Sequence, residues 1–124
     1  KKYVEAYDHR VGKWQTLPST ISDHEISGTC SIYEGKIYVC GGCLVKSCEV
    51  YDPVARKWEE LAPMIKKVRR PEMVVYENAL WVVDGFPNHN IQKYDPQLNE
   101  WCTSSRLKRI MNCMSFDVLD AVVF

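Results

Sequence analysis

Short apolar runs alternate with turn-forming residues along the whole chain. Two pairs of runs stand out, because each pair flanks a tight turn at Glu34-Gly35 or at Glu77-Asn78. The runs are 30–33 with 37–40 and 73–76 with 80–83, and a third pair of the same kind lies at 114–116 and 121–124. Apolar runs on both sides of a turn are typical of antiparallel strands, and their uninterrupted apolar character predicts burial on both faces.

The pattern leaves almost no room for helices. One stretch, residues 64–70, has a composition that suits a helix, but it is short and is followed by Pro71. Proline lacks the backbone N–H that a helix interior needs, so this stretch cannot extend. The chain is therefore predicted to be all-β.

A three-residue signature recurs along the chain at a fixed period. It consists of Tyr-Asp followed by Trp seven residues after the Tyr, and its copies begin 44 and then 43 residues apart: Tyr7-Asp8 with Trp14, Tyr51-Asp52 with Trp58, and Tyr94-Asp95 with Trp101. Self-similarity at a fixed period of this length indicates an array of structural repeats. Turn formers lie between the Asp and the Trp, so each copy predicts a strand, a turn and a second strand.

The two kinds of hairpin alternate, so each repeat contains four short strands. Four antiparallel strands in about 40–50 residues are typical of one blade of a β-propeller. We expect residues 1–28 to hold the last two strands of a blade and a link. Residues 29–71 and 72–110 then form complete blades with links, and residues 111–124 form the first two strands of a further blade.

The signature resembles the kelch repeat, in which a double glycine follows the second strand and precedes Tyr-Asp and Trp. Gly41-Gly42, Tyr51-Asp52 and Trp58 form one full copy, whereas the next copy departs from it with Asp84-Gly85 at the glycine position. The resemblance implies an arc of a ring that has six blades in most kelch propellers. It also implies structural roles for Gly41, Gly42 and the three Tyr–Trp pairs. We expect the aromatic rings to pack between neighbouring blades and each Asp to cap its turn.

The resemblance also sets the functional expectations. It is strongest to the kelch domain of BTB-kelch proteins, which implies a non-catalytic module that recognises substrates for a cullin-based ubiquitin ligase through BTB and BACK domains. An alternative within the family is binding to actin or another cytoskeletal partner. An alternative of another class is an enzyme or a cysteine-based redox or metal sensor. The implied location is the cytoplasm, with the nucleus as a second option.

Composition narrows the classes of partner. The 16 Lys and Arg residues balance 16 Asp and Glu residues, which argues against a nucleic-acid-binding stripe. No apolar run reaches the roughly 18 residues of a membrane span. The first residues, Lys1-Lys2-Tyr3-Val4, include neither an initiator Met nor a signal peptide, so we expect an origin inside a larger protein and a reducing compartment.

Six cysteines raise the question of metal or redox chemistry. Cys40-Gly41-Gly42-Cys43 has the spacing of zinc and dithiol sites, and Cys48 and His89 are the nearest further ligands. The family's double glycine already accounts for the central residues, so ordinary strand cysteines are the preferred interpretation. We predict no metal and no cofactor, and we expect Cys43 to be the most exposed thiol.

Recognition is therefore expected on the loops, because rigid scaffolds present function on the connections between strands. Two links into first strands are basic, and arginine binds carboxylates through paired hydrogen bonds, so the predicted partner is an acidic protein or peptide. The alternative is that these arginines pair within the scaffold. The predicted contact residues are His24, Lys46, Arg69, Arg70, Phe86, Asn88, His89, Arg109 and Asn112.

Overall fold

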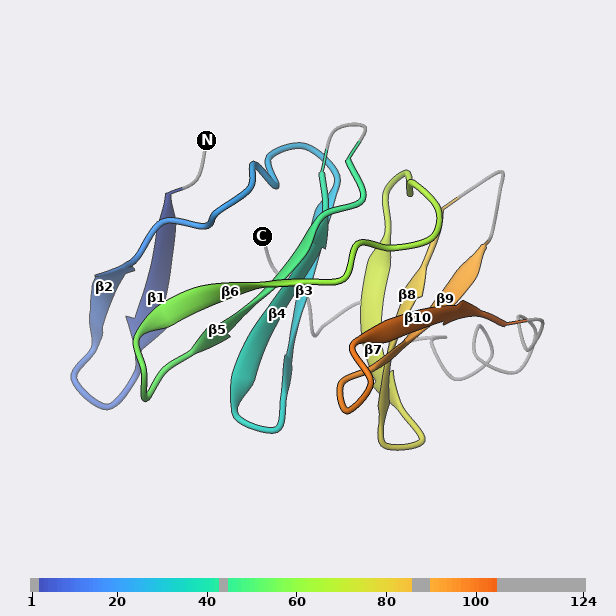
Figure 1. The fold of residues 1–124 in the computed structure, drawn as a ribbon. Helices are drawn as coiled ribbons and strands as arrows, with labels where there is room; N and C mark the ends of the chain where they lie inside the picture. The colour runs from blue at the N-terminus through green and yellow to red at the C-terminus, as the bar shows by residue number, and fades with distance from the viewer. Residues whose placement is uncertain (1–2, 43–44, 86–89, 105–124) are drawn as a thin grey trace.

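The computed structural model describes residues 3–42, 45–85 and 90–104 of the 124-residue chain, and this part consists of strands, turns and links (Figure 1). Its ten strands are β1 (Val4–Asp8), β2 (Lys13–Leu17), β3 (Gly28–Tyr33), β4 (Lys36–Gly41), β5 (Cys48–Asp52), β6 (Lys57–Leu61), β7 (Glu72–Tyr76), β8 (Ala79–Val83), β9 (Ile91–Asp95) and β10 (Glu100–Thr103). No helix of the described residues is long and apolar enough to cross a membrane. The all-β prediction is confirmed.

The strands form three antiparallel sheets in chain order. The first sheet contains β1 and β2, the second contains β3 to β6, and the third contains β7 to β10. Within each sheet, every strand pairs with its neighbour in sequence. The prediction of four short antiparallel strands per repeat is thus confirmed in the second and third sheets. The prediction of two further strands near the C-terminus lies outside the described residues.

The seven-residue signature has a simple structural cause. In each outer hairpin the Tyr and the Trp are directly opposite each other, as the pairs Tyr7 with Trp14, Tyr51 with Trp58 and Tyr94 with Trp101. Their ring centroids lie 5.4, 5.2 and 4.9 Å apart, in the same order. Aromatic pairs at this separation stabilise a hairpin beyond the area that they bury. The spacing therefore fixes the register of the outer strands.

The Asp that follows each Tyr closes the turn, as expected. Its Oδ1 accepts a hydrogen bond from the backbone N–H two residues later, at 2.9 Å for Asp8, 2.8 Å for Asp52 and 2.9 Å for Asp95. The pKa of Asp8 is lowered mainly by the hydrogen bond from the Arg10 side chain and, to a smaller extent, by the backbone N–H of Arg10. The pKa of Asp52 is lowered first by the backbone N–H groups of Val54 and Ala55.

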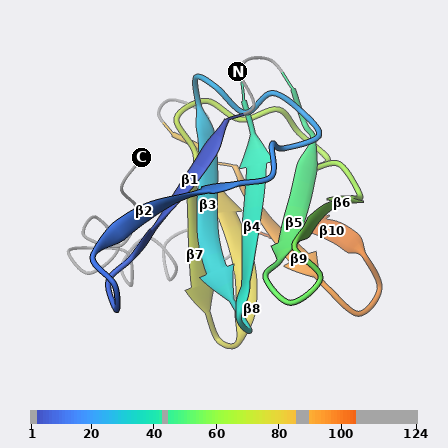
Figure 2. The ribbon, with the colours of Figure 1, turned by 90° about the vertical axis from the view of Figure 1, so that its left-hand side faces the viewer.

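The main core lies between the second and third sheets. Buried side chains from both sheets meet there, among them Tyr38, Val50, Leu80 and Tyr94. The innermost strands β3 and β7 lie side by side, and the backbone N–H of Met73 donates to Thr29 Oγ1 at 3.0 Å. Figure 2 shows the first sheet lying across the opposite face of the second sheet. The three sheets are therefore stacked in chain order.

Close contact between chain segments explains the second glycine of the double-glycine position. A Cβ added to Gly42 would lie 2.8 Å from the Asp23 carbonyl oxygen, and one added to Gly85 would lie 2.7 Å from the Arg69 carbonyl oxygen. Gly42 also has a φ of +145°, which L-residues with side chains rarely adopt. Gly42 and Gly85 thus hold the same position in two repeats, each beneath a link. The next repeat differs only at the first position of the pair, where Asp84 replaces the glycine that corresponds to Gly41.

The three Tyr–Trp pairs differ in how far the described sheets cover them. Tyr51, Trp58 and Tyr94 are 3%, 8% and 2% exposed, whereas Tyr7 and Trp14 are 52% and 67% exposed. The pair in the second and third sheets faces the preceding sheet, and no sheet of the described residues precedes β1. The local signature therefore determines the hairpin, and a neighbouring sheet determines its burial.

Burial of the inner hairpins is also less complete than the apolar runs predict. Every residue of β8 is buried, which matches the expectation. In β3 and β7, however, Ile32 and Val75 are exposed. These two residues occupy the same position in their repeats, two residues before the hairpin turn.

Candidate partner-binding surface

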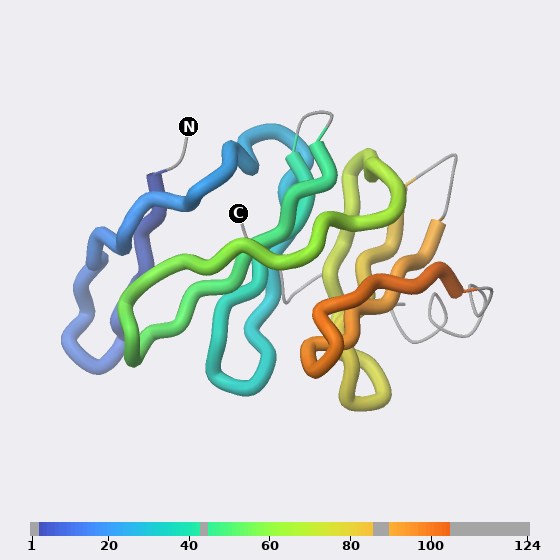
Figure 3. The backbone as a smooth tube through the Cα atoms, viewed as in Figure 1, coloured from blue at the N-terminus to red at the C-terminus, as the bar shows by residue number. Residues whose placement is uncertain are grey.

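The links and loops gather at one end of the stacked sheets, and the tight turns lie at the other end (Figure 3). The links that lead from an outer strand to the next inner strand are residues 18–27 and 62–71. The connection between β4 and β5 lies at the same end. The two links and the described part of the β4–β5 connection therefore lie on one face.

The second link is fixed to the third sheet by one buried side chain. Gln92 Oε1 accepts hydrogen bonds from the backbone N–H groups of Ile65 at 2.8 Å and Lys66 at 3.1 Å. Gln92 Nε2 donates in return to the Lys66 carbonyl oxygen at 3.1 Å. Three backbone groups of the link are satisfied by a side chain that is itself fully buried on β9.

A second anchor holds the far end of this link. The backbone N–H of Arg69 donates to Asp84 Oδ1, and the N–H of Gly85 donates to the Arg69 carbonyl oxygen at 2.8 Å. Met64, just before the first anchor, and Val68, between the two anchors, are buried in the core. Because these apolar side chains occupy the inner face, the charged side chains of the link, Lys66, Lys67, Arg69 and Arg70, are all exposed.

Lys46 joins this basic surface from the loop between β4 and β5. Its side chain is exposed, and its carbonyl oxygen accepts a hydrogen bond from the backbone N–H of Met64 at 2.9 Å. The backbone of Lys46 is thus bonded to the link that carries Arg69 and Arg70. Within the described part of the chain, no ion pair engages either guanidinium. Here the "basic surface" means Lys46, Lys66, Lys67, Arg69 and Arg70.

His24 was predicted to contact a partner, and the structure contradicts this. Its side chain is buried, with Nδ1 2.5 Å from the Gly41 carbonyl oxygen and Nε2 2.8 Å from Glu49 Oε2. The same Glu49 carboxylate accepts hydrogen bonds from the backbone N–H groups of Ile21 and Ser22. His24 is therefore part of the anchor of the first link, because a polar loop residue can turn inward when a buried acceptor is available.

Glu49 and Gln92 were missed as functional residues by sequence reasoning. Each lies two residues before the Tyr of its signature, is fully buried, and holds the link that precedes its own sheet. The signal for them was present, since a polar residue in an otherwise apolar buried strand needs hydrogen-bond partners. The repeat shows that both partners are links.

The other predicted contact residues lie outside the described part of the chain: Phe86, Asn88, His89, Arg109 and Asn112. Their roles stay predictions.

Of the two cysteines in the CxxC segment, Cys40 belongs to the described residues. Cys40 is buried and lies opposite Cys48, which is also buried. Burial raises the pKa of the Cys40 thiol well above its usual range and that of Cys30 to about 11. Both thiols thus stay protonated at neutral pH and are poor nucleophiles. Cys43 lies outside the described residues, and among the described residues no cluster of three His, Cys, Asp or Glu side chains could hold a metal ion.

Known proteins with similar sequences contain the same kind of repeat. A model of the Kelch motif matches residues 27–65. Kelch-like protein 23 of Pongo abelii is 33% identical over 105 residues, which cover 79% of this chain and 18% of that protein. Kelch-like protein 13 of Mus musculus is 38% identical over 63 residues, which cover 46% of this chain and 10% of that protein. The chain thus spans less than one fifth of the length of these relatives.

Solved structures show the same architecture. A fungal alcohol oxidase of the AA5 family in complex with copper has a TM-score of 0.64 at 21% identity and covers 81% of this chain and 23% of its own. YjhT has a TM-score of 0.61 at 22% identity and covers 72% of this chain and 29% of its own. At these identities the likeness concerns the fold. Together with the repeat signature, the motif match and the similar sequences, it identifies the chain as one built of kelch repeats folded as blades of a β-propeller.

Proposed function

We propose that this chain is a non-catalytic protein-interaction module whose basic surface binds an acidic segment of a partner protein. The observation that carries the proposal is the anchoring of residues 62–71. Gln92 and Asp84 fix the backbone of the link at two points, residues 65–66 and residue 69, so its exposed cationic side chains project from an anchored base. A preorganised base lowers the conformational entropy that binding would otherwise cost.

The chemistry of the surface favours carboxylates. Arg69 and Arg70 are adjacent and exposed, and a guanidinium can bind a carboxylate through two parallel hydrogen bonds. Lysines nearby add long-range attraction, which raises the rate of association at low ionic strength. An acidic peptide therefore matches the surface in charge and in hydrogen-bonding geometry.

A more specific role rests on the similarity to kelch-like proteins. In this role the chain is the substrate-recognition part of a BTB-kelch adaptor for a cullin-based ubiquitin ligase in the cytoplasm or nucleus. The role predicts that the polypeptide carrying these repeats also carries BTB and BACK domains, and that capture of that polypeptide from cells returns a cullin.

The binding proposal is tested with a fluorescent decamer of glutamate as the probe, titrated with the 124-residue chain and followed by anisotropy. Changing Arg69→Glu and Arg70→Glu together should weaken binding by about 100-fold, the loss expected from two interfacial charge contacts. The matched control is Arg56→Glu with Lys57→Glu, which makes the same charge change where the turn between β5 and β6 leads into β6, and that turn lies at the opposite end of the sheets (Figure 1). An equal loss in both double variants would show attraction to net charge alone and would refute the proposed site.

A further inference from the structure

The two connections that lead from an outer strand to the next inner strand differ in length by one residue. Tyr33 and Tyr76 hold the same position in their repeats, because each ends the first inner strand and lies opposite the residue that follows the turn. Tyr33 lies one residue farther from the preceding signature Trp than Tyr76 does. The connection through residues 18–27 therefore contains one residue more than the connection through residues 62–71.

The extra residue is accommodated in a tight turn before β3. Ile26 and Ser27 have φ values of +58° and +71°, whereas in residues 62–71 only Arg70 has a positive φ, at +47°. The left-handed conformation is costly for L-residues with a Cβ, and it is a true outlier for β-branched residues such as isoleucine. The Ile26 side chain is 71% exposed, so its own packing does not offset this cost.

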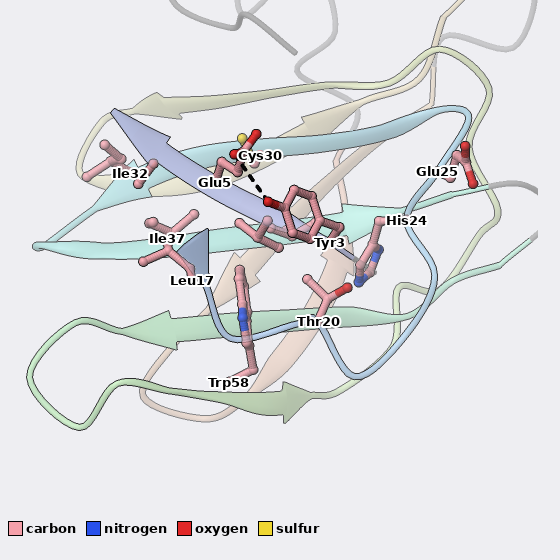
Figure 4. A pocket seen from close by; sticks show the side chains of 13 residues that line it. Tyr3, Glu5, Leu17, Thr20, His24, Glu25, Cys30, Ile32, Ile37 and Trp58 are labelled. Carbon is pink, nitrogen blue, oxygen red and sulfur yellow. Dashed lines mark hydrogen bonds between the residues drawn. The ribbon is translucent and has the colours of Figure 1, made fainter. Parts of the chain in front are cut away.

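The base of this turn is fixed to the second sheet. His24 Nδ1 and Nε2 lie 2.5 Å from the Gly41 carbonyl oxygen and 2.8 Å from Glu49 Oε2. Figure 4 shows the His24 side chain pointing from the link toward this sheet, where it lines the cleft between the first two sheets. Gly28 leaves no room for a Cβ beneath the His24 carbonyl oxygen, so the turn closes tightly. The surrounding structure therefore holds Ile26 in an unfavourable conformation, and residues held in this way cluster at functional sites.

The tip of the turn lies beside the basic surface. A Cβ added to Gly41 would lie 3.3 Å from the Ser27 carbonyl oxygen and 3.2 Å from Val68 Cγ2, so both links contact the same glycine. Ser27 directly follows Ile26, and Val68 directly precedes Arg69. An exposed apolar side chain and an exposed pair of arginines are therefore adjacent parts of one surface.

The exposure of Ile26 belongs to its position in the repeat. Ile26 lies seven residues before Tyr33, and Arg69 lies seven residues before Tyr76. Arg69 is also exposed, although the complete sheet of β3 to β6 precedes its own sheet. The position thus faces solvent in both repeats, and it carries an apolar side chain in one and a guanidinium in the other.

We propose that Ile26 is an apolar contact residue for the partner, an inference that rests on the proposed function. The partner segment then carries an apolar side chain next to its carboxylates. The carboxylates bind Arg69 and Arg70, and the apolar side chain packs on Ile26. Because isoleucine has few rotamers and the base of the turn is fixed, this contact costs little conformational entropy. A purely acidic segment would leave Ile26 in water, so the surface discriminates between the two kinds of segment.

The test compares two fluorescent probes by anisotropy: the decamer of glutamate, and a decamer of glutamate whose two central residues are leucine. The 124-residue chain should bind the leucine-containing probe about 10-fold more tightly, as expected for burial of an apolar contact, although this probe carries fewer charges. Ile26→Asn should remove the advantage and leave the affinity for the purely acidic probe unchanged. The matched control is Val54→Asn, which replaces a 93% exposed β-branched residue on the turn between β5 and β6 and should change neither affinity.

Urea unfolding supplies a second readout that a structural role of Ile26 would move the other way. Asparagine adopts the left-handed conformation more readily than isoleucine, so Ile26→Asn should raise the urea midpoint while it weakens binding of the leucine-containing probe. Ile26→Leu should keep the preference for that probe, because it keeps an apolar side chain. A lower midpoint for Ile26→Asn, or equal affinity of the unmodified chain for the two probes, would overturn the inference and leave the proposed function standing. Absence of binding to both probes would refute the proposed function and this inference with it.

Discussion

The hairpin of β1 and β2 and the hairpin of β5 and β6 have the same signature and the same strand pairing, but different surroundings. The ring centroids of their Tyr–Trp pairs lie 5.4 and 5.2 Å apart, and Asp8 and Asp52 close their turns in the same way. Trp14 is 67% exposed, however, and Trp58 is 8% exposed. The comparison shows that the signature encodes a hairpin and that stacking of neighbouring repeats supplies most of the burial. This is the behaviour expected of repeat proteins, in which stability is approximately a sum of repeat and interface contributions.

The largest difference is expected at the two tryptophans. Trp58→Ala should lower the free energy of unfolding by about 3–5 kcal/mol, because it removes a buried ring and leaves a cavity. Trp14→Ala should cost less than about 1 kcal/mol, because it loses only a cross-strand contact with Tyr7. Urea unfolding followed by far-ultraviolet circular dichroism measures both values. Equal losses would show that the hairpin itself, rather than the neighbouring sheet, provides the stability.

A second difference concerns the acidic residues that lie two positions before each Tyr. Glu49 is buried and accepts hydrogen bonds from Ile21, Ser22 and His24, whereas Glu5 is exposed and accepts one from the Tyr3 hydroxyl at 3.2 Å. Glu49→Ala should lower the free energy of unfolding by roughly 3 kcal/mol, because it leaves buried donors without an acceptor. Glu5→Ala should change it by no more than about 0.5 kcal/mol.

The charge of Glu49 can be separated from its hydrogen bonds by the variant Glu49→Gln. Gln92 performs the same task in the third sheet with a neutral amide, so we expect this variant to lose only roughly 1 kcal/mol. Urea unfolding is again the measurement, with Gln92→Ala as the matched control for loss of an anchor. A loss as large as that of Glu49→Ala would mean that the negative charge of Glu49, and not the anchoring of the link, is the main contribution.

The same two hairpins show what could be predicted from the sequence. The period, the strands, the Tyr–Trp pairing and the role of Asp52 follow from local patterns, because turn chemistry and side-chain alternation act over a few residues. The exposure of Trp14 and the inward turn of His24 could not be predicted in this way. Trp14 depends on which sheet lies beside it, and His24 depends on Glu49, a residue 25 positions away in the sequence. The exposed basic link was predicted as a charge run, but its rigidity comes from Gln92 and Asp84, whose partners only the fold reveals.

The smallest difference is expected at the turns, where the two hairpins are most alike. The pKa of Asp52 is lowered chiefly by the backbone N–H of Val54, and that of Asp8 chiefly by the side chain of Arg10. A carboxyl whose pKa is lower in the folded state stabilises the fold above the pKa of the unfolded chain, near 3.8, and this contribution disappears as the pH falls through the folded value. Asp52→Asn and Asp8→Asn should therefore lower the urea midpoint slightly at pH 7, and the midpoints of both variants should converge with that of the unmodified chain as the pH falls below the lowered pKa of each carboxyl.

The effects of the two substitutions are expected to differ in their dependence on salt. Exposed charge pairs are screened at high ionic strength, where the Debye length falls to about 3 Å at 1 M, while hydrogen bonds from backbone N–H groups to a carboxylate keep their geometry. We therefore expect sodium chloride at about 1 M to screen the charges strongly. At pH 7 it should remove most of the effect of Asp8→Asn on the urea midpoint and little of the effect of Asp52→Asn. If salt reduced both effects equally, the turn of the second sheet would also depend on a charge partner. Lys36, whose Nζ lies 3.8 Å from Asp52 Oδ2, would be that partner, and Lys36→Gln would then reproduce the loss.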